Sequence, residues 1–162
     1  DFGLPVEVLD RLIAARRWDI HRDPHEDPEA LDDYLEATGA GLMWLATRCL
    51  GAPDAAEFAV RAYGWANAAA MYLRAVPELE ARGRRPLPDG VDAQDLARRG
   101  MKKLVEARQA RKAVPKEVAP ALLAGWQAEA LLNQVLGGRS FAELPEAQKR
   151  WRLLWQAFSG RW

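Results

Sequence analysis

The residues best placed to form a binding site lie in the stretch 61–89. On an ideal helix, which turns by about 100° per residue, one face is formed by four side chains without an oxygen or nitrogen atom: Ala68, Met71, Ala75 and Leu79. The stretch ends in a basic, glycine-containing exit, Arg82-Gly83-Arg84, followed by Leu87-Pro88. The pattern predicts an apolar surface beside the rim of an anion site.

A second basic segment follows between residues 98 and 116. It consists of Arg98, Arg99, Lys102, Lys103, Arg108, Arg111, Lys112 and Lys116. Such a band is able to hold phosphate groups or an anionic membrane surface. The alternative is a solvated helix face.

The C-terminal stretch combines aromatic and basic side chains. These are Trp151, Trp155, Phe158 and Trp162 together with Lys149, Arg150, Arg152 and Arg161. The combination fits a helix that lies in a membrane interface or docks on a protein partner. Ordinary core packing of the aromatic stripe, with Leu154 on the same side, is the alternative.

Other chemistry finds little support. His21 and His25 are four residues apart, but they lie in a proline-interrupted segment with no third ligand in register, so no metal site is predicted. There is no pairing of a nucleophile with a base, no phosphate loop and no nucleic-acid module. We therefore expect no cofactor and no nucleic-acid partner.

Composition fits one compact domain over residues 1–162, with 49% apolar residues. The net charge is zero, but residues 1–60 hold 5 Lys and Arg against 13 Asp and Glu, whereas the remainder holds 18 against 10. This asymmetry favours an anionic ligand, a membrane surface or an acidic partner for the second part. Two faces that neutralise each other within one domain would give the same numbers.

The single cysteine, Cys49, excludes an internal disulfide and fits a reducing compartment. It is expected to be a small buried side chain. No apolar run approaches the 18 or more residues of a membrane-spanning helix, and no signal peptide is present. The expectation is a cytoplasmic protein, with peripheral contact with the membrane as an alternative. Because the chain begins at Asp1 without a methionine, we expect a fragment.

Hydrophobic periodicity predicts an all-α fold of about six helices without strands. Helices are expected over 5–20 and 28–51, over a long segment that begins near residue 54, and over 92–99, 101–113, 120–136 and from Pro145 onward. The long segment is expected to begin with an Asp54/Glu57 capping box and to be kinked or interrupted at Pro77. A break is expected at Gly100. Gly39 and Gly41 fall inside the second of these helices, where each costs about 1 kcal/mol relative to alanine. Close packing of another helix, or approach of a ligand, would explain them.

Four segments carry a resemblance to the squalene/phytoene synthases, all-α enzymes that join two prenyl diphosphates. They are LIAARRWDI, YLEATGAGLMWLA, the stretch 61–89, and ARQARKAVP with PALLAGW. The resemblance covers nearly the whole chain but corresponds to the latter half or so of such a protein. The first aspartate-rich motif of the family, which lies further towards the N-terminus, is not in the sequence.

Within the stretch 61–89 the family frame is retained but its ligands are not. The frame matches at Gly64, Ala66, Leu73, Arg74, Val76, Glu78, Arg82, Gly83, Arg84, Leu87 and Pro88. Where the family has glutamine, asparagine and two aspartates, this sequence has Ala68, Met71, Ala75 and Leu79. On the resemblance, substrate contacts are expected from Tyr34, Arg74, Glu78, Arg82 and Arg84, and catalytic residues from none.

Magnesium binds oxygen ligands, usually carboxylates with phosphate and water, and alanine or leucine offers none. The preferred hypothesis is therefore a catalytically degenerate member that binds an isoprenoid, another lipid or a protein partner. The resemblance implies a particular role, because a non-catalytic branch of the family assists assembly of respiratory complex I. The alternative is an active magnesium-dependent prenyltransferase with carboxylates supplied by an N-terminal part that this sequence lacks.

Overall fold

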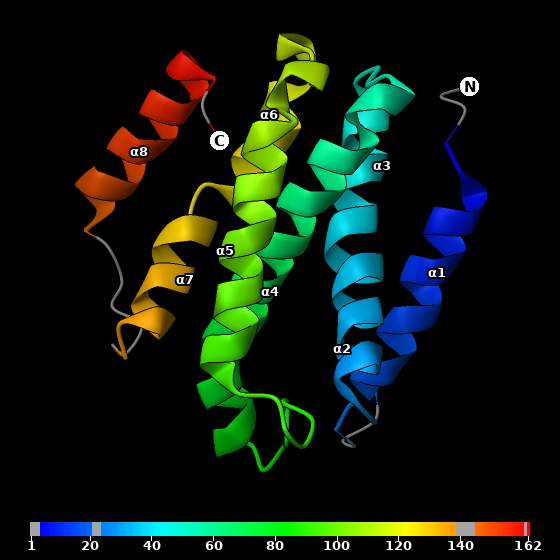
Figure 1. The fold of residues 1–162 in the computed structure, drawn as a ribbon, viewed down its shortest axis with the longest axis vertical. Helices are drawn as coiled ribbons and strands as arrows, with labels where there is room; N and C mark the ends of the chain where they lie inside the picture. Colours follow the sequence, from blue (N-terminus) through cyan, green and yellow to red (C-terminus); the bar gives the residue numbers. More distant parts are fainter. Residues whose placement is uncertain (1–3, 21–23, 139–144, 161) are drawn as a thin grey trace.

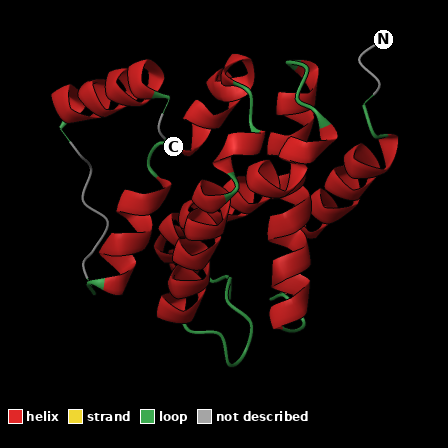
Figure 2. Ribbon diagram, turned by 45° about the horizontal axis from the view of Figure 1, so that its top comes forward, coloured by secondary structure: helices red, strands yellow, loops and turns green. Residues whose placement is uncertain are grey.

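The computed structural model describes residues 4–20, 24–138, 145–160 and 162, and this part of the chain is helical without strands (Figure 2). The α-helices are α1 (Val6–Arg16), α2 (Pro28–Leu35), α3 (Gly41–Cys49), α4 (Glu57–Ala81), α5 (Ala93–Gln109), α6 (Ala119–Leu122), α7 (Ala128–Leu136) and α8 (Glu146–Ser159). A π-helical segment, Glu36–Ala40, joins α2 to α3, and a 3-10 turn, Leu123–Gly125, follows α6. Counting the joined α2–α3 run once gives seven helices in the described part of the chain, of which α6 is a single turn, against about six predicted, and the all-α prediction is confirmed.

Helix α4 is the centre of the arrangement. It packs against α5, α3, α7 and the π segment, with α1 to α3 on one side and α7 and α8 on the other (Figure 1). Side chains around most of its circumference are buried, including Val60, Tyr63, Trp65 and Leu73. A helix that is apolar on nearly all sides is stable only where neighbouring elements bury those sides.

Close backbone packing explains the glycines of the second helical run. A Cβ atom added to Gly39 would lie 2.2 Å from the Cβ of Ala68 and 3.0 Å from the carbonyl oxygen of Gly64. A Cβ added to Gly41 would lie 3.0 Å from Cγ1 of Val8. The close-packing interpretation of Gly39 and Gly41 therefore agrees with the structure, and the π segment lies directly against α4.

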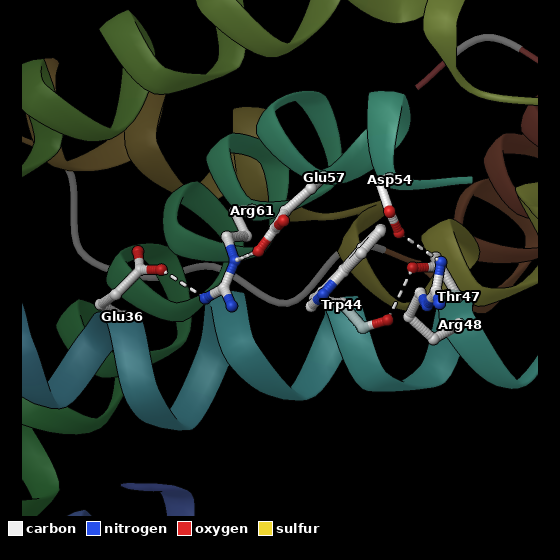
Figure 3. A network of polar contacts seen from close by, with 7 residues as sticks. All are labelled: Glu36, Trp44, Thr47, Arg48, Asp54, Glu57 and Arg61. Atoms are coloured by element: carbon white, nitrogen blue, oxygen red, sulfur yellow. Dashed lines mark hydrogen bonds and ion pairs between the residues drawn. The ribbon is translucent and has the colours of Figure 1, made fainter. Parts of the chain in front are cut away.

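Arginine ion pairs join the start of α4 to the preceding run (Figure 3). Arg61 contacts Glu57 at 2.7 Å through Nε and Glu36 at 2.8 Å through Nη1. Arg48 Nη1 contacts Asp54 at 2.7 Å. The predicted capping box is wrong, because neither Asp54 nor Glu57 caps the helix and both carboxylates are bound by arginines instead. The other predicted helix start is confirmed, since Asp27 Oδ1 accepts a 2.7 Å hydrogen bond from the Ala30 amide.

Two predicted helix interruptions do not occur. Helix α4 continues through the exposed Pro77 to Ala81. Helix α5 continues through Gly100, because that glycine gives room to Leu132 of α7, whose Cδ atoms would lie 2.9 Å from an added Cβ. In contrast, the helix expected over 120–136 is divided by a turn at Trp126 and Gln127.

Several predicted buried residues are exposed. Cys49 is exposed because it is the last residue of α3. Helix α1 buries no residue, although its apolar side chains have helical spacing. On α8, Trp151, Leu154, Trp155 and Phe158 are exposed, so core packing is wrong for these four side chains. Trp162 is buried against Tyr63, at 4.9 Å between ring centroids.

None of the helices in the described part of the chain is long and apolar enough to cross a bilayer.

Replacing Gly39 with alanine is expected to lower the free energy of unfolding by about 1–3 kcal/mol, because the added methyl group overpacks against Ala68. Chemical denaturation measures the change. The double variant Gly39→Ala/Ala68→Gly moves the methyl group across the contact and is expected to recover part of the loss. Equal stability of Gly39→Ala and the parent would contradict the close contact.

Candidate functional site

A cavity of about 550 Å3 lies along α4, between the α2–α3 run and α6. Its α4 wall contains Ala68, Met71, Ala75 and Leu79, all four residues of the predicted apolar face. The sequence showed that these residues share a face. The structure adds that the face lines a hollow within the size range of small-molecule sites, about 300–1,000 Å3.

The opposite walls are also small or apolar. Leu42, Met43 and Ala46 come from α3, and Ala121 and Ala124 come from the α6 region. Along α4, eleven residues separate Ala68 from Leu79, which corresponds to about 16 Å at 1.5 Å per residue. The cavity is therefore elongated enough along this helix to take an extended apolar chain.

Three polar side chains from different elements meet at the cavity. The Tyr34 hydroxyl donates to Asp19 Oδ1 at 2.8 Å. Arg16 Nη1 donates to Asp19 Oδ2 at 3.0 Å and to the Tyr34 hydroxyl oxygen at 3.2 Å. Burial, with the hydrogen bond to Asp19, raises the pKa of Tyr34 to about 12, so this hydroxyl keeps its proton at neutral pH.

Arg84 brings the basic exit of α4 to this polar group. Its Nη2 donates to the backbone carbonyl of Asp19 at 3.2 Å, and its guanidinium lies 5.4 Å from the centroid of the Trp18 ring. Both Trp18 and Arg84 line the cavity. Among the described residues, two guanidinium groups and one carboxylate thus stand together, and these three side chains carry a net positive charge.

The remaining predicted contact residues lie elsewhere. Arg82 pairs with Glu78 at 2.5 Å on the exposed surface. Arg74 is exposed and does not line the cavity. The structure therefore brings together Tyr34 and Arg84 from the five predicted contact residues, and separates Arg74, Glu78 and Arg82 from them.

His25, for which the sequence predicts no role, lies beside the polar group. His25 is 5% exposed and stacks on Trp18, with ring centroids 3.8 Å apart and planes at 12°. Its ring also lies 5.0 Å from that of Tyr34. Burial lowers the pKa of His25, against the attraction of Asp19, and so favours the neutral imidazole. His21, which is four residues from His25 and with it is predicted to form no metal site, lies outside the described residues.

Arg16, Trp18 and Asp19 were also missed as site residues. All three lie in the last turns of the first predicted helix, within the LIAARRWDI segment. The sequence signal that could have identified these residues was the concentration of aromatic and charged side chains at the end of an apolar helix. It does not specify which tertiary neighbour they meet.

The oxygen donors of the cavity do not fit a magnesium–diphosphate site. Among the described residues that line it, Asp19 is the one carboxylate, and Arg16 and Tyr34 already bind both of its oxygens. Asn67 offers an amide oxygen that is buried without a hydrogen-bond partner in the described chain. Magnesium sites that hold diphosphate usually use one or two carboxylates open to the ion.

The geometry defines a helical protein with an elongated, largely apolar cavity whose charged side chains gather at one place. Squalene synthase HpnC from Alicyclobacillus acidocaldarius has a similar fold, with a TM-score of 0.70 and 23% sequence identity over 86% of this chain. The match covers 63% of the HpnC chain, so this chain spans less than two thirds of that protein. No curated protein matches the sequence significantly.

The family model for squalene/phytoene synthase matches residues 1–94. This match covers more than half of the chain and includes the α1–α4 walls of the cavity. The chain belongs to the squalene/phytoene synthase family.

Because His25 is buried, the free energy of unfolding is expected to depend on pH. The pKa of His25 in the folded protein is below the ordinary value of 6.5. As the pH falls below about 6.5, the unfolded chain therefore binds a proton on this histidine more readily than the folded protein does. The free energy of unfolding is expected to decrease over the same pH range. Denaturant titrations between neutral and mildly acidic pH measure the slope. His25→Phe keeps the stacking on Trp18 and is expected to flatten the curve; an unchanged slope in this variant would contradict the assignment.

Proposed function

We propose that this protein binds an isoprenoid-like lipid in the cavity along α4 and does not catalyse magnesium-dependent prenyl transfer. The observation that carries the proposal is the position of Ala68, Met71, Ala75 and Leu79. These residues occupy the places of the family's polar ligands, and all four line the cavity.

The metals of a prenyl diphosphate reaction neutralise the leaving group, a contribution of several kcal/mol to the barrier. An apolar wall supplies none of it. The same wall is suited to an isoprenoid chain, because transfer of apolar surface from water is favourable by about 25 cal/mol per Å2. In this proposal, loss of the metal ligands abolishes prenyl transfer but leaves the affinity of the cavity for the prenyl chain of the substrate.

The polar group at the cavity sets the orientation of the ligand in this proposal. Arg16 and Arg84 attract a polar or anionic end, and the Tyr34 hydroxyl keeps its proton. The apolar end then extends along α4 towards Ala68.

A binding role of this kind is compatible with assistance to respiratory complex I assembly, which the resemblance implies for a non-catalytic member. The observation that favours a protein partner is the apolar side of α1, where Val6, Leu9 and Ile13 are exposed. Copurification of complex I subunits with the full-length protein tests this role, with Val6→Ser/Ile13→Ser as the variant expected to lose them.

Ala75→Asp is expected to weaken binding of farnesol about tenfold or more, because the new carboxylate must be desolvated against apolar walls. Calorimetric titration without metal measures the affinity. The matched control is Ala55→Asp, on the exposed surface before α4, which is expected to leave the affinity unchanged.

The catalytic alternative is tested on the full-length protein with farnesyl diphosphate and magnesium, with product analysis by mass spectrometry. We expect no squalene or phytoene-type product. Turnover that a chelator abolishes would overturn the proposal, and would show that carboxylates outside this chain complete a metal site.

Arg84 and Arg82 give a matched pair of variants for the polar end of the ligand. Arg84→Ala is expected to weaken farnesyl diphosphate binding by about tenfold, the effect of one lost charge-assisted hydrogen bond, and to change farnesol binding little. Arg82→Ala is expected to leave both affinities unchanged, because Arg82 pairs with Glu78 away from the cavity. Equal losses in the two variants would contradict the assignment of Arg84 to the site.

A further inference from the structure

Helix α8 holds the largest group of exposed apolar side chains in the described part of the chain. Trp151, Leu154, Trp155 and Phe158 are 67%, 65%, 56% and 91% exposed. On a regular helix they fall within an arc of about 100°. Figures 1 and 2 both place α8 at the edge of the bundle.

The contacts on the other side of α8 fix which way this face points. Gln156 Nε2 donates to the carbonyl oxygen of Leu122 and to the Tyr63 hydroxyl, both at 3.4 Å. Gln156 lies about 150° around the helix from the middle of the apolar arc. Leu154 and Phe158 lie about 160° around the helix from Gln156 and therefore point away from the bundle. Trp151 and Trp155 of the same face also line a hollow between α8 and the bundle.

Basic side chains surround this face. Arg150 is exposed beside Leu154, and Arg152 lies on the opposite flank. Phe158 shares a surface hollow with Arg111, Lys112 and Lys116, which form no ion pair with any described residue.

The nearby carboxylates do not cancel this charge. Glu146 pairs with Lys149 and Glu129 pairs with Arg108. Glu117 is exposed next to Lys116. The five arginines and lysines around the face thus stand against one unpaired carboxylate among the described residues, which leaves this side of the molecule positively charged.

We propose that α8 docks this protein peripherally on an anionic membrane surface. An amphipathic helix with tryptophan, phenylalanine and leucine on one face and arginine or lysine at its edges inserts its apolar face at the boundary between headgroups and acyl chains. Tryptophan favours that depth, and the neighbouring basic residues are attracted to the negative leaflet. This inference is independent of the proposed ligand of the cavity.

The test uses the full chain without a cavity ligand. Vesicles of equal parts phosphatidylglycerol and phosphatidylcholine are compared with vesicles of phosphatidylcholine alone by cosedimentation. We expect binding to the anionic vesicles that weakens as salt is added, because surface charges are screened within about 10 Å at 0.1 M. Brominated acyl chains are expected to quench tryptophan fluorescence on binding.

Two sets of variants separate the apolar and basic contributions. Leu154→Ser/Phe158→Ser is expected to reduce partition into anionic vesicles by about tenfold or more, since each side chain loses its transfer from water. Lys112→Ala/Lys116→Ala is expected to reduce binding to anionic vesicles and to lessen its salt dependence. The matched control is Phe58→Ser, a side chain of α4 that is 59% exposed outside this face and is expected to leave binding unchanged. Circular dichroism establishes that each variant is folded.

Three results would overturn the proposal. The first is a parent protein that stays in the supernatant with anionic vesicles. The second is an equal loss of binding in Phe58→Ser and Leu154→Ser/Phe158→Ser. The third is a concentration-dependent dimer in sedimentation velocity that only the α8 variant loses, which would make the face a contact between two copies of this chain.

Discussion

The contact between Gly39 and α4 is the constraint on which the cavity depends. The absence of a side chain at Gly39 allows the π segment to lie directly against Ala68 and Gly64. Gly39, Thr38 and Ala68 then become part of the cavity wall. A larger residue at either side of this contact would separate the two helices, so the helix spacing and the width of the cavity are fixed by the same few small residues.

Polarity within the cavity is concentrated where three elements meet. Arg16 ends α1 and Asp19 follows it, Tyr34 lies in α2, and Arg84 follows α4. Hydrogen bonds connect these four residues. The rings of His25 and Trp18 stack on each other beside this group. In contrast, the wall along α4 contributes no charged side chain. Charged side chains and apolar surface are therefore separated within the cavity, and the proposed orientation of an isoprenoid-like ligand rests on this separation.

Membership of the family and the proposed loss of its metal ligands are compatible because they depend on different residues. The frame residues Gly64, Ala66, Leu73 and Val76 are buried and hold α4 in the bundle. Met71, Ala75 and Leu79 face the cavity, where a change of side chain alters the cavity wall more than the packing of the helices, whereas Ala68 contributes to both. A fold can therefore retain its helices while the site on it changes chemistry.

The sequence by itself determined the helical class, the shared face of Ala68, Met71, Ala75 and Leu79, and the basic exit after α4, because these are properties of neighbouring residues on one helix. It also pointed to close packing at Gly39, since a mid-helix glycine has a known cost. Only the tertiary structure decided that α5 continues through Gly100, that Arg84 reaches the cavity while Arg82 does not, and that the aromatic face of α8 is exposed. Each of these depends on which distant segment covers a given face. Hydrophobic periodicity identifies which side chains share one face of a helix, but long-range packing decides which segment of the chain that face contacts.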